Sequence, residues 1–134
     1  MKKTAFITLV LLIFATLNSC SNSNADSQFV KKWVLISVSG ATPDQDKILG
    51  IDNIFFDLRD DESMDARWYD ENSDTEFEDM KGRWMTTKVG EEGYDLFLFY
   101  GPGTKKSKIY AIKKVTEKQM IMTISGIDHI FEAK

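Results

Sequence analysis

The sequence predicts an all-β protein whose strands form an antiparallel up-and-down β-barrel of about eight strands. Short segments rich in apolar, β-branched and aromatic residues recur at roughly ten-residue spacing after residue 28. Polar or glycine-containing turns separate these segments, and no strong helical periodicity follows residue 28. Because the turns are short, each strand is expected to pair with the next one along the chain.

The first half of this region contains five expected strands, at residues 29–39, 53–59, 64–70, 75–80 and 82–88. A loop at residues 40–50 carries Gly40, Pro43 and Gly50. Polar turns at residues 60–63 and 71–74 separate the next segments.

The second half is more regular, with expected strands at residues 94–100, 108–116, 119–125 and 128–133. The strongest is residues 94–100, which lies between the turn at residues 90–93 and the Gly101-Pro102-Gly103 break. Both of its faces are largely apolar, so the strand is covered on both sides or faces a cavity on one. The total of eight or nine strands fits a sandwich or a barrel.

Residues 1–19 have the order of a bacterial export signal. Lys2 and Lys3 precede an apolar run at residues 5–17, and Leu17-Asn18-Ser19-Cys20 resembles a lipobox. A transmembrane helix is the alternative, but the apolar run is shorter than the roughly 20 residues needed to span a bilayer. An ordinary cleaved signal followed by a chance cysteine is a second alternative. We therefore expect lipid attachment at Cys20 and a location in the cell envelope.

The domain boundaries follow from this signal. Residues 20–28 are mostly polar and are expected to form a flexible tether, and residues 29–134 form the barrel domain. Ser21 stands where other lipoproteins carry an aspartate for inner-membrane retention, which favours the outer membrane. Cys20 is the only cysteine, so the domain has no internal disulfide.

The charge is unevenly distributed along the chain. Residues 20–79 contain 15 acidic and 5 basic residues (15 − 5 = 10 negative charges), and residues 80–134 contain 6 acidic and 10 basic residues (10 − 6 = 4 positive charges). The net balance of residues 20–134 is negative, which argues against nucleic acid as a partner. One interpretation is a single domain with oppositely charged ends. The preferred one places the early acidic residues in loops and the late lysines at strand edges, where they protect against unwanted strand pairing.

No catalytic or metal-binding motif stands out. His129 is the only histidine and is expected to be structural or exposed. Residues 70–76 begin like an EF-hand loop, but Thr75 replaces the sixth-position glycine and Lys81 replaces the twelfth-position glutamate. Lys105, Lys106 and Lys108 are expected at a solvated loop tip, with contact to anionic lipid headgroups as the alternative. The sequence thus predicts no enzyme, no metal and no cofactor.

Three sequence elements resemble the family of small bacterial lipocalin-like lipoproteins. They are the opening Phe29-Val30-Lys31-Lys32-Trp33-Val34-Leu35 strand, the Gly82-Arg83-Trp84 element, and the closing hairpins with Tyr110-Ala111-Ile112, Met120-Ile121-Met122 and Ile130-Phe131. The resemblance implies a calycin-type barrel, whose interior holds either packed side chains or one small ligand.

Two functions follow as hypotheses. The first is a lipid-anchored protein that binds a small apolar or amphipathic molecule among Trp33, Trp84, Phe97 and Tyr110, which are large aromatic residues on separate strands. The second is a solid barrel that contacts an envelope protein through the acidic loops of residues 57–79. An envelope enzyme is the third hypothesis. It ranks last because the sequence shows no recognisable set of catalytic residues.

Overall fold

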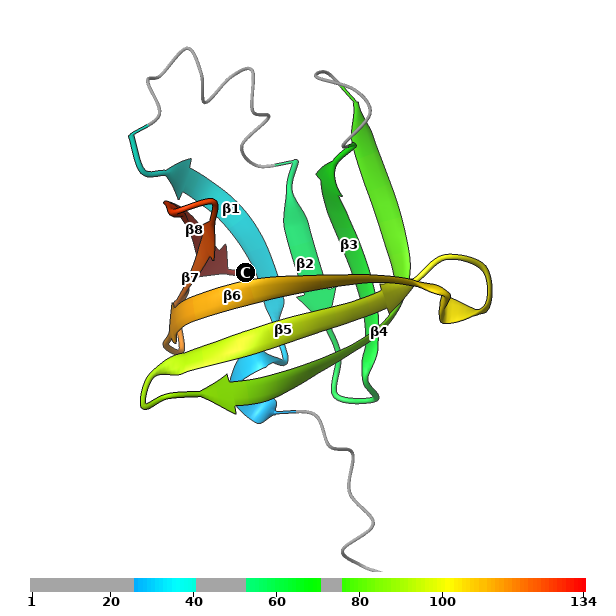
Figure 1. Cartoon of the computed structure of the whole chain (residues 1–134), viewed down its shortest axis with the longest axis horizontal. Coiled ribbons are helices and arrows are strands. Elements are labelled where there is room, and N and C mark those ends of the chain that lie inside the picture. Colours follow the sequence, from blue (N-terminus) through cyan, green and yellow to red (C-terminus); the bar gives the residue numbers. More distant parts are fainter. Residues whose placement is uncertain (1–25, 41–52, 71–75) are drawn as a thin grey trace, which may run out of the picture.

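A closed eight-stranded antiparallel barrel forms the body of this protein in a computed structural model, which describes residues 26–40, 53–70 and 76–134 (Figure 1). The elements in chain order are η1 (Ser27–Phe29), β1 (Lys32–Val38), β2 (Phe55–Leu58), β3 (Ser63–Tyr69), β4 (Phe77–Val89), β5 (Gly93–Tyr100), η2 (Pro102–Thr104), β6 (Lys106–Val115), β7 (Gln119–Ile124) and β8 (Ile127–Ala133). Each strand pairs with the next, which confirms the predicted up-and-down meander.

The barrel closes where its first strand pairs with its last. Trp33 lies opposite Ala133, Leu35 opposite Phe131, and Val38 opposite His129. A bulge between Leu35 and Ser37 shifts this register, and a second bulge lies between Ile112 and Lys114 in the β6–β7 pair. Bulges bend strands, and closure of a sheet into a barrel requires such curvature.

Strand β4 departs from the predicted pattern. The sequence suggested two strands, at residues 75–80 and 82–88, but the structure has one strand of 13 residues. Its first part pairs with β3 and its second part with β5, and the two pairings overlap only at Gly82 and Arg83. A Cβ atom added to Gly82 would lie 1.8 Å from the carbonyl oxygen of Phe99. Gly82 therefore lets the backbones of β4 and β5 approach closely where the strand changes partner.

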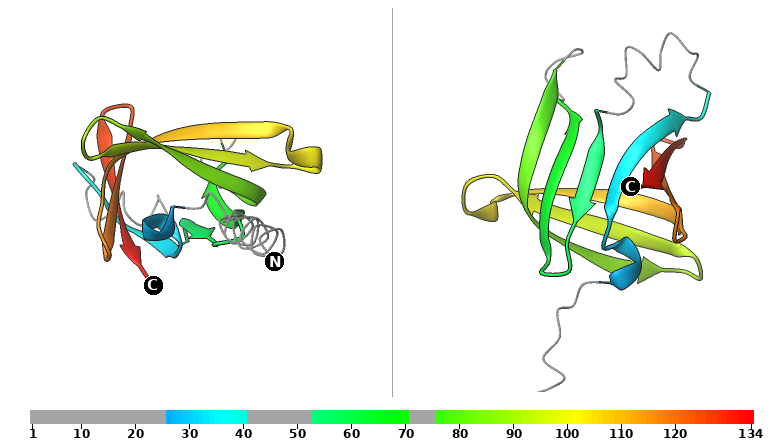
Figure 2. Two further views of the ribbon diagram at one scale, coloured as in Figure 1. Left: turned by 90° about the horizontal axis from the view of Figure 1, so that it is seen from below. Right: turned by 180° about the vertical axis from the view of Figure 1, so that it is seen from behind.

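The two ends of the barrel differ in character. At one end, η1 lies beside the start of β1 and brings the fully buried Phe29 into the interior (Figure 2). We call this the Phe29 end. The opposite end is where β1, β3, β5 and β7 finish and where β6 begins with Lys106 and Lys108. We call it the Lys108 end.

Only part of the predicted domain division falls within the residues that the structure describes. Residues 1–25, which include the expected signal and Cys20, lie outside the described residues. The tether was expected to reach Gln28, whereas residues Ser27–Phe29 form η1. The side chain of Asp26 caps this turn by accepting a hydrogen bond from the backbone N–H of Gln28, and the Gln28 amide donates to the Tyr94 hydroxyl at 2.8 Å. Two residues expected in the tether, Ser27 and Gln28, therefore belong to η1.

Candidate functional site

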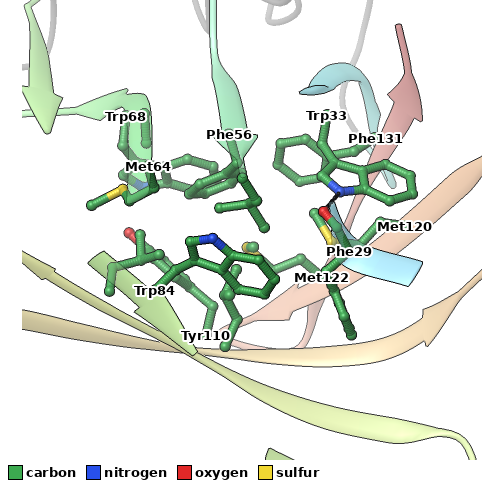
Figure 3. Packing of buried hydrophobic residues seen from close by; sticks show 14 of the residues in the cluster. Phe29, Trp33, Phe56, Met64, Trp68, Trp84, Tyr110, Met120, Met122 and Phe131 are labelled. Atoms are coloured by element: carbon green, nitrogen blue, oxygen red, sulfur yellow. Dashed lines mark hydrogen bonds between the residues drawn. The ribbon is translucent and has the colours of Figure 1, made fainter. Parts of the chain in front are cut away.

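An aromatic cluster around Trp68 crosses the interior of the barrel (Figure 3). The Trp68 ring on β3 lies 5.6 Å from Phe56, 5.4 Å from Tyr110, 5.8 Å from His129 and 6.2 Å from Phe131, measured between ring centroids. These partners come from β2, β6 and β8. Because β6 and β8 are not neighbours of β3 in the sheet, the side chains span the barrel and fill it at this level.

A second cluster closes the Phe29 end. Phe29 lies 6.4 Å from Trp84 and 5.1 Å from Tyr94 between ring centroids. The indole N–H of Trp33 donates to the Phe29 carbonyl at 3.0 Å, and that of Trp84 donates to the Arg59 carbonyl at 2.9 Å. Buried indoles need such a partner. Trp33 and Trp84 therefore join η1 and the β2–β3 turn to the core at the Phe29 end of the barrel.

The four aromatic residues expected to bind a ligand do not come together. Trp33 and Trp84 are buried at the Phe29 end, and Tyr110 belongs to the Trp68 cluster. Phe97 alternates with the buried Leu96 and Leu98 of β5 and so faces the outside of the barrel. Its cross-strand neighbours there are Met85 and Ile109, which are 47% and 62% exposed. The outward row of Met85, Phe97 and Ile109 is thus a surface feature.

Three charged side chains meet at the Lys108 end. Glu78 on β4 lies next to Trp68 in the β3–β4 register, and Lys108 on β6 precedes Tyr110 on the inward face of its strand. The Glu78 carboxylate lies 3.7 Å from the ammonium nitrogen of Lys108 and 3.7 Å from that of Lys106. Both ammonium groups lie about 6 Å from the ring of Tyr100, within the range of a cation–π contact.

Lys108 corrects the expectation of a solvated loop tip. Its side chain is only 15% exposed, and its Nζ atom is enclosed by the protein. Lys106 is 62% exposed and Glu78 is 29% exposed, so the cluster reaches solvent at its rim. The sequence already indicated that Lys108 faces inward, because it shares a strand face with Tyr110 and Ile112. Trp68 was also absent from the expected site, although it is central to the interior.

His129 is buried rather than exposed. It retains 9% of its accessible surface, and its Nδ1 atom lies 3.1 Å from the carbonyl oxygen of Ile127. With a proton on Nδ1, this contact is a hydrogen bond that fixes the ring against Trp68. In residues 26–40, 53–70 and 76–134, no three His, Cys, Asp or Glu side chains are grouped as a metal site requires. The surroundings of His129 indicate a structural role.

Several acids of the residue 57–79 segment already have basic partners within the chain. Arg59 pairs with Asp57 and Asp65, and Arg67 donates to Asp79 at 2.7 Å. The hydrogen bond from Arg67 holds the pKa of Asp79 below its ordinary value. These pairs lie on the outer face of β2, β3 and β4, around a hollow of about 330 Å³ that also contains Lys32 and Lys81. The hollow therefore carries both signs of charge.

Part of the predicted acidic contact surface can be located. Asp70 and Glu76 flank the β3–β4 connection, where the Asp70 N–H donates to the Glu76 carbonyl at 3.0 Å. Asp74 lies outside the described residues. Of the helices that the structure describes, none is long and apolar enough to cross a bilayer.

Comparisons with known proteins give little beyond this geometry. No family model matches the chain, and no curated protein matches it significantly. Among solved structures, the chain is similar to an uncharacterised protein from Bacteroides eggerthii, with a TM-score of 0.47 and 14% sequence identity over 79% of this chain and 99% of that chain. A likeness at this level carries no argument about function. The lipocalin-like resemblance stays a prediction.

Proposed function

We propose that this chain is a lipid-anchored envelope protein whose barrel binds a small apolar or amphipathic molecule at the Lys108 end, without catalysis. The anchor rests on the export signal and on Cys20, and the outer membrane on Ser21. The binding role rests on the eight-stranded barrel and on the side chains at that end.

The observation that carries the binding role is the ion pair of Glu78 and Lys108 turned toward the barrel interior. Moving a charged group out of water is costly, and Lys108 is only 15% exposed while Glu78 is 29% exposed. Costly polar groups beside an apolar floor are typical of binding sites, where a few polar groups orient a mostly apolar ligand. Trp68 and Tyr110 provide the apolar floor here.

Native mass spectrometry tests this proposal. The full chain is produced in bacterial cells, extracted from the membrane fraction and transferred to an amphipathic polymer, so that no free detergent competes for the site. We expect a retained small molecule that dissociates when the barrel is unfolded. A chain that carries only its own mass, and that takes up neither dodecanoate nor dodecanol when each is added, contradicts the binding role.

The anchor is tested separately. In a Cys20→Ser variant we expect the acyl mass on the N-terminal peptide to be lost, together with membrane retention through a high-salt wash. A Ser21→Ala variant is the matched control and should keep both. An unmodified Cys20 in the wild-type chain would overturn the anchor and leave the binding role standing.

A second function, a solid barrel that serves as a protein-interaction module of the envelope, is favoured by the filled interior around Trp68. Its expected contact surface is the acidic connection with Asp70, Asp74 and Glu76. Charge reversal at these three positions should abolish capture of an envelope partner, and raising the salt concentration should weaken capture by the wild type. Capture that survives both changes would exclude the acidic surface.

A further inference from the structure

We propose that two copies of this chain associate through the outer face of β4, β5 and β6, related by a two-fold axis. This inference goes beyond the proposed function and takes from it only the lipid anchor. It depends on an exposed apolar row across this face, on the charges beside the row, and on the position of η1.

The apolar row crosses the three strands at one level. Met85 lies opposite Phe97 in the β4–β5 register, and Phe97 lies opposite Ile109 in the β5–β6 register. Met85 is 47% exposed and Ile109 is 62% exposed. Single apolar residues scattered over a surface are normal, but neighbours on three adjacent strands form a continuous patch, which is typical of a protein–protein contact.

A basic and an acidic side chain flank the row on opposite sides. Arg83 on β4 lies opposite Phe99 on one side, and Asp95 on β5 lies opposite Thr87 on the other. Arg83 is 63% exposed and contacts Glu62 through its Nη2 atom. A guanidinium group has five N–H donors, so it can bind a second carboxylate as well. Among the residues that the structure describes, Asp95 has no ion pair and no side-chain hydrogen bond.

A two-fold axis along the row makes this face complementary to itself. Rotation about that axis brings Met85, Phe97 and Ile109 each opposite its own counterpart, so the apolar row is buried against an identical row. The rotation also exchanges the two sides of the row. Arg83 of one copy then lies beside Asp95 of the other, and the symmetry forms this pair twice.

A second copy fits this face better than a lipid bilayer does. Asp95 borders the row, and Glu91 and Glu92 lie in the exposed turn between β4 and β5. Insertion of the row into a bilayer would bring these carboxylates to the headgroup level, where anionic lipids repel them. The second copy instead presents Arg83 to Asp95.

The position of η1 agrees with two copies anchored in one membrane. Phe29 in η1 contacts Trp84 of β4 and Tyr94 of β5, and Figure 1 shows η1 below β4, on the side away from β6. An axis along the row runs from β6 to β4, so it places η1 of both copies on the same side. Cys20 precedes the first described residue by 26 − 20 = 6 positions, so both lipid anchors would also lie on that side.

The contact is small, so it should form mainly on the membrane. Eight residues of β4, at positions 82–89, pair with β5, which gives a face about 26 Å long and, for three strands, about 14 Å wide. This footprint of about 360 Å² is about half of the area that a standard interface buries on each partner. Two anchors in one membrane raise the local concentration of the copies and offset the small area.

Cross-linking in isolated membranes tests which face is in contact. Ile109 lies on the proposed axis, so in Ile109→Cys the two introduced thiols face each other and a short bismaleimide should join the copies. Ile127→Cys is the matched control, because Ile127 is 45% exposed at the start of β8, outside β4, β5 and β6. We expect a cross-linked dimer in Ile109→Cys and only background in Ile127→Cys.

Energy transfer measures the affinity and its dependence on charge. Full chains labelled with donor or acceptor at Ile127→Cys are mixed in phosphatidylcholine liposomes, and transfer is followed against the protein-to-lipid ratio. Asp95→Arg should lower the dimer affinity about tenfold, because symmetry removes two charge pairs at once. The Arg83→Asp/Asp95→Arg exchange should restore the affinity to within about threefold. Phe97→Glu should abolish transfer while its urea midpoint stays near that of the wild type, because this side chain faces outward.

Each outcome decides the proposal. Random energy transfer in the wild type at every protein-to-lipid ratio overturns the dimer, and quenching of a dye at Met85→Cys by brominated lipid would then assign the face to the bilayer. Equal cross-linking of Ile109→Cys and Ile127→Cys, or transfer that Phe97→Glu leaves unchanged, overturns this face as the contact. An unmodified Cys20 overturns only the anchor, and energy transfer in solution at rising protein concentration then decides the dimer.

Discussion

Replacing Gly82 with alanine should destabilise the barrel far more than a single methyl group ordinarily does. The added Cβ would lie 1.8 Å from the Phe99 carbonyl oxygen and 2.9 Å from the Tyr100 Cα, both backbone atoms of β5. Real contacts of this kind are essentially never shorter than 3.0 Å, so the strands must separate by at least 3.0 − 1.8 = 1.2 Å. A side-chain rotation cannot relieve the clash, because both partners belong to the backbone.

The magnitude follows from the ladder between β4 and β5. A separation of this size stretches a hydrogen bond of about 2.9 Å to about 4 Å, beyond the range of a bond. Roughly two ladder bonds are affected, and each buried group left unsatisfied costs about 1–3 kcal/mol, so we expect a loss of about 2–6 kcal/mol. The free energy of unfolding of a domain is typically about 5–15 kcal/mol. The expected loss is therefore comparable to the whole stability of a domain at the lower end of this range.

Urea unfolding followed by tryptophan fluorescence measures the loss. With a slope of about 1–3 kcal/mol per molar urea, the midpoint of Gly82→Ala should fall by about 1 M or more. Gly90→Ala is the control: Gly90 has φ +68° and open space around it, so alanine there meets only the left-handed backbone cost of about 1–2 kcal/mol. A Gly82→Ala midpoint as high as that of the control would refute the close approach of β4 and β5.

Two further predictions concern the core and an outer ion pair. Trp68→Ala should lower the free energy of unfolding by about 3–5 kcal/mol, because it leaves a cavity among Phe56, Tyr110 and Phe131, and calorimetry should show a smaller loss for Trp68→Phe; equal losses would place the ring outside a packed interior. The Lys113 ammonium at 3.0 Å, and then the Thr123 hydroxyl, hold the pKa of Asp128 below its ordinary value. The lowered pKa stabilises the fold above about pH 4, and the contribution is lost as the pH falls through the lowered pKa. The urea midpoints of wild type and Asp128→Asn should therefore differ at pH 6, and the difference should shrink as the pH falls below about 4; a difference that is constant with pH would contradict this pair.

The strand bounds in the second half of the chain were predictable because turn residues mark them. Gly93–Tyr100 differs from the expected strand by one residue, since Gly90 to Gly93 and Gly101 bound it. Strand β4 was not predictable as one element. In the sequence, Gly82 interrupts the pattern of strand-forming residues and suggests a break. Its role, as a residue where β4 changes partner, depends on the pairing of β4 with both β3 and β5 in the folded barrel.

The inward faces and the site were predictable only in part. Leu96 and Phe97 are both apolar, so alternation left the inward face of β5 undecided; in the fold Leu96 is buried and Phe97 faces outward. The meeting of Trp68 with Tyr110 and Phe131 depends on the curvature and closure of the barrel, which local patterns do not contain. Lys108 was within reach of the sequence, since a lysine on the face of Tyr110 and Ile112 points toward the interior.

The pairing of β1 with β8 imposes an order on the assembly of the protein. Trp33 and Ala133 are partners although 133 − 33 = 100 residues separate them along the chain. A ribosome delivers a chain from its N-terminus, so β1 is made first and its edge toward β8 stays unpaired until the last strand follows. During that wait, an unpaired strand edge and the unfinished interior face solvent, which is the state most prone to aggregation. A chaperone that binds this free edge of β1 would therefore act before closure, because β8 occupies the edge in the folded barrel.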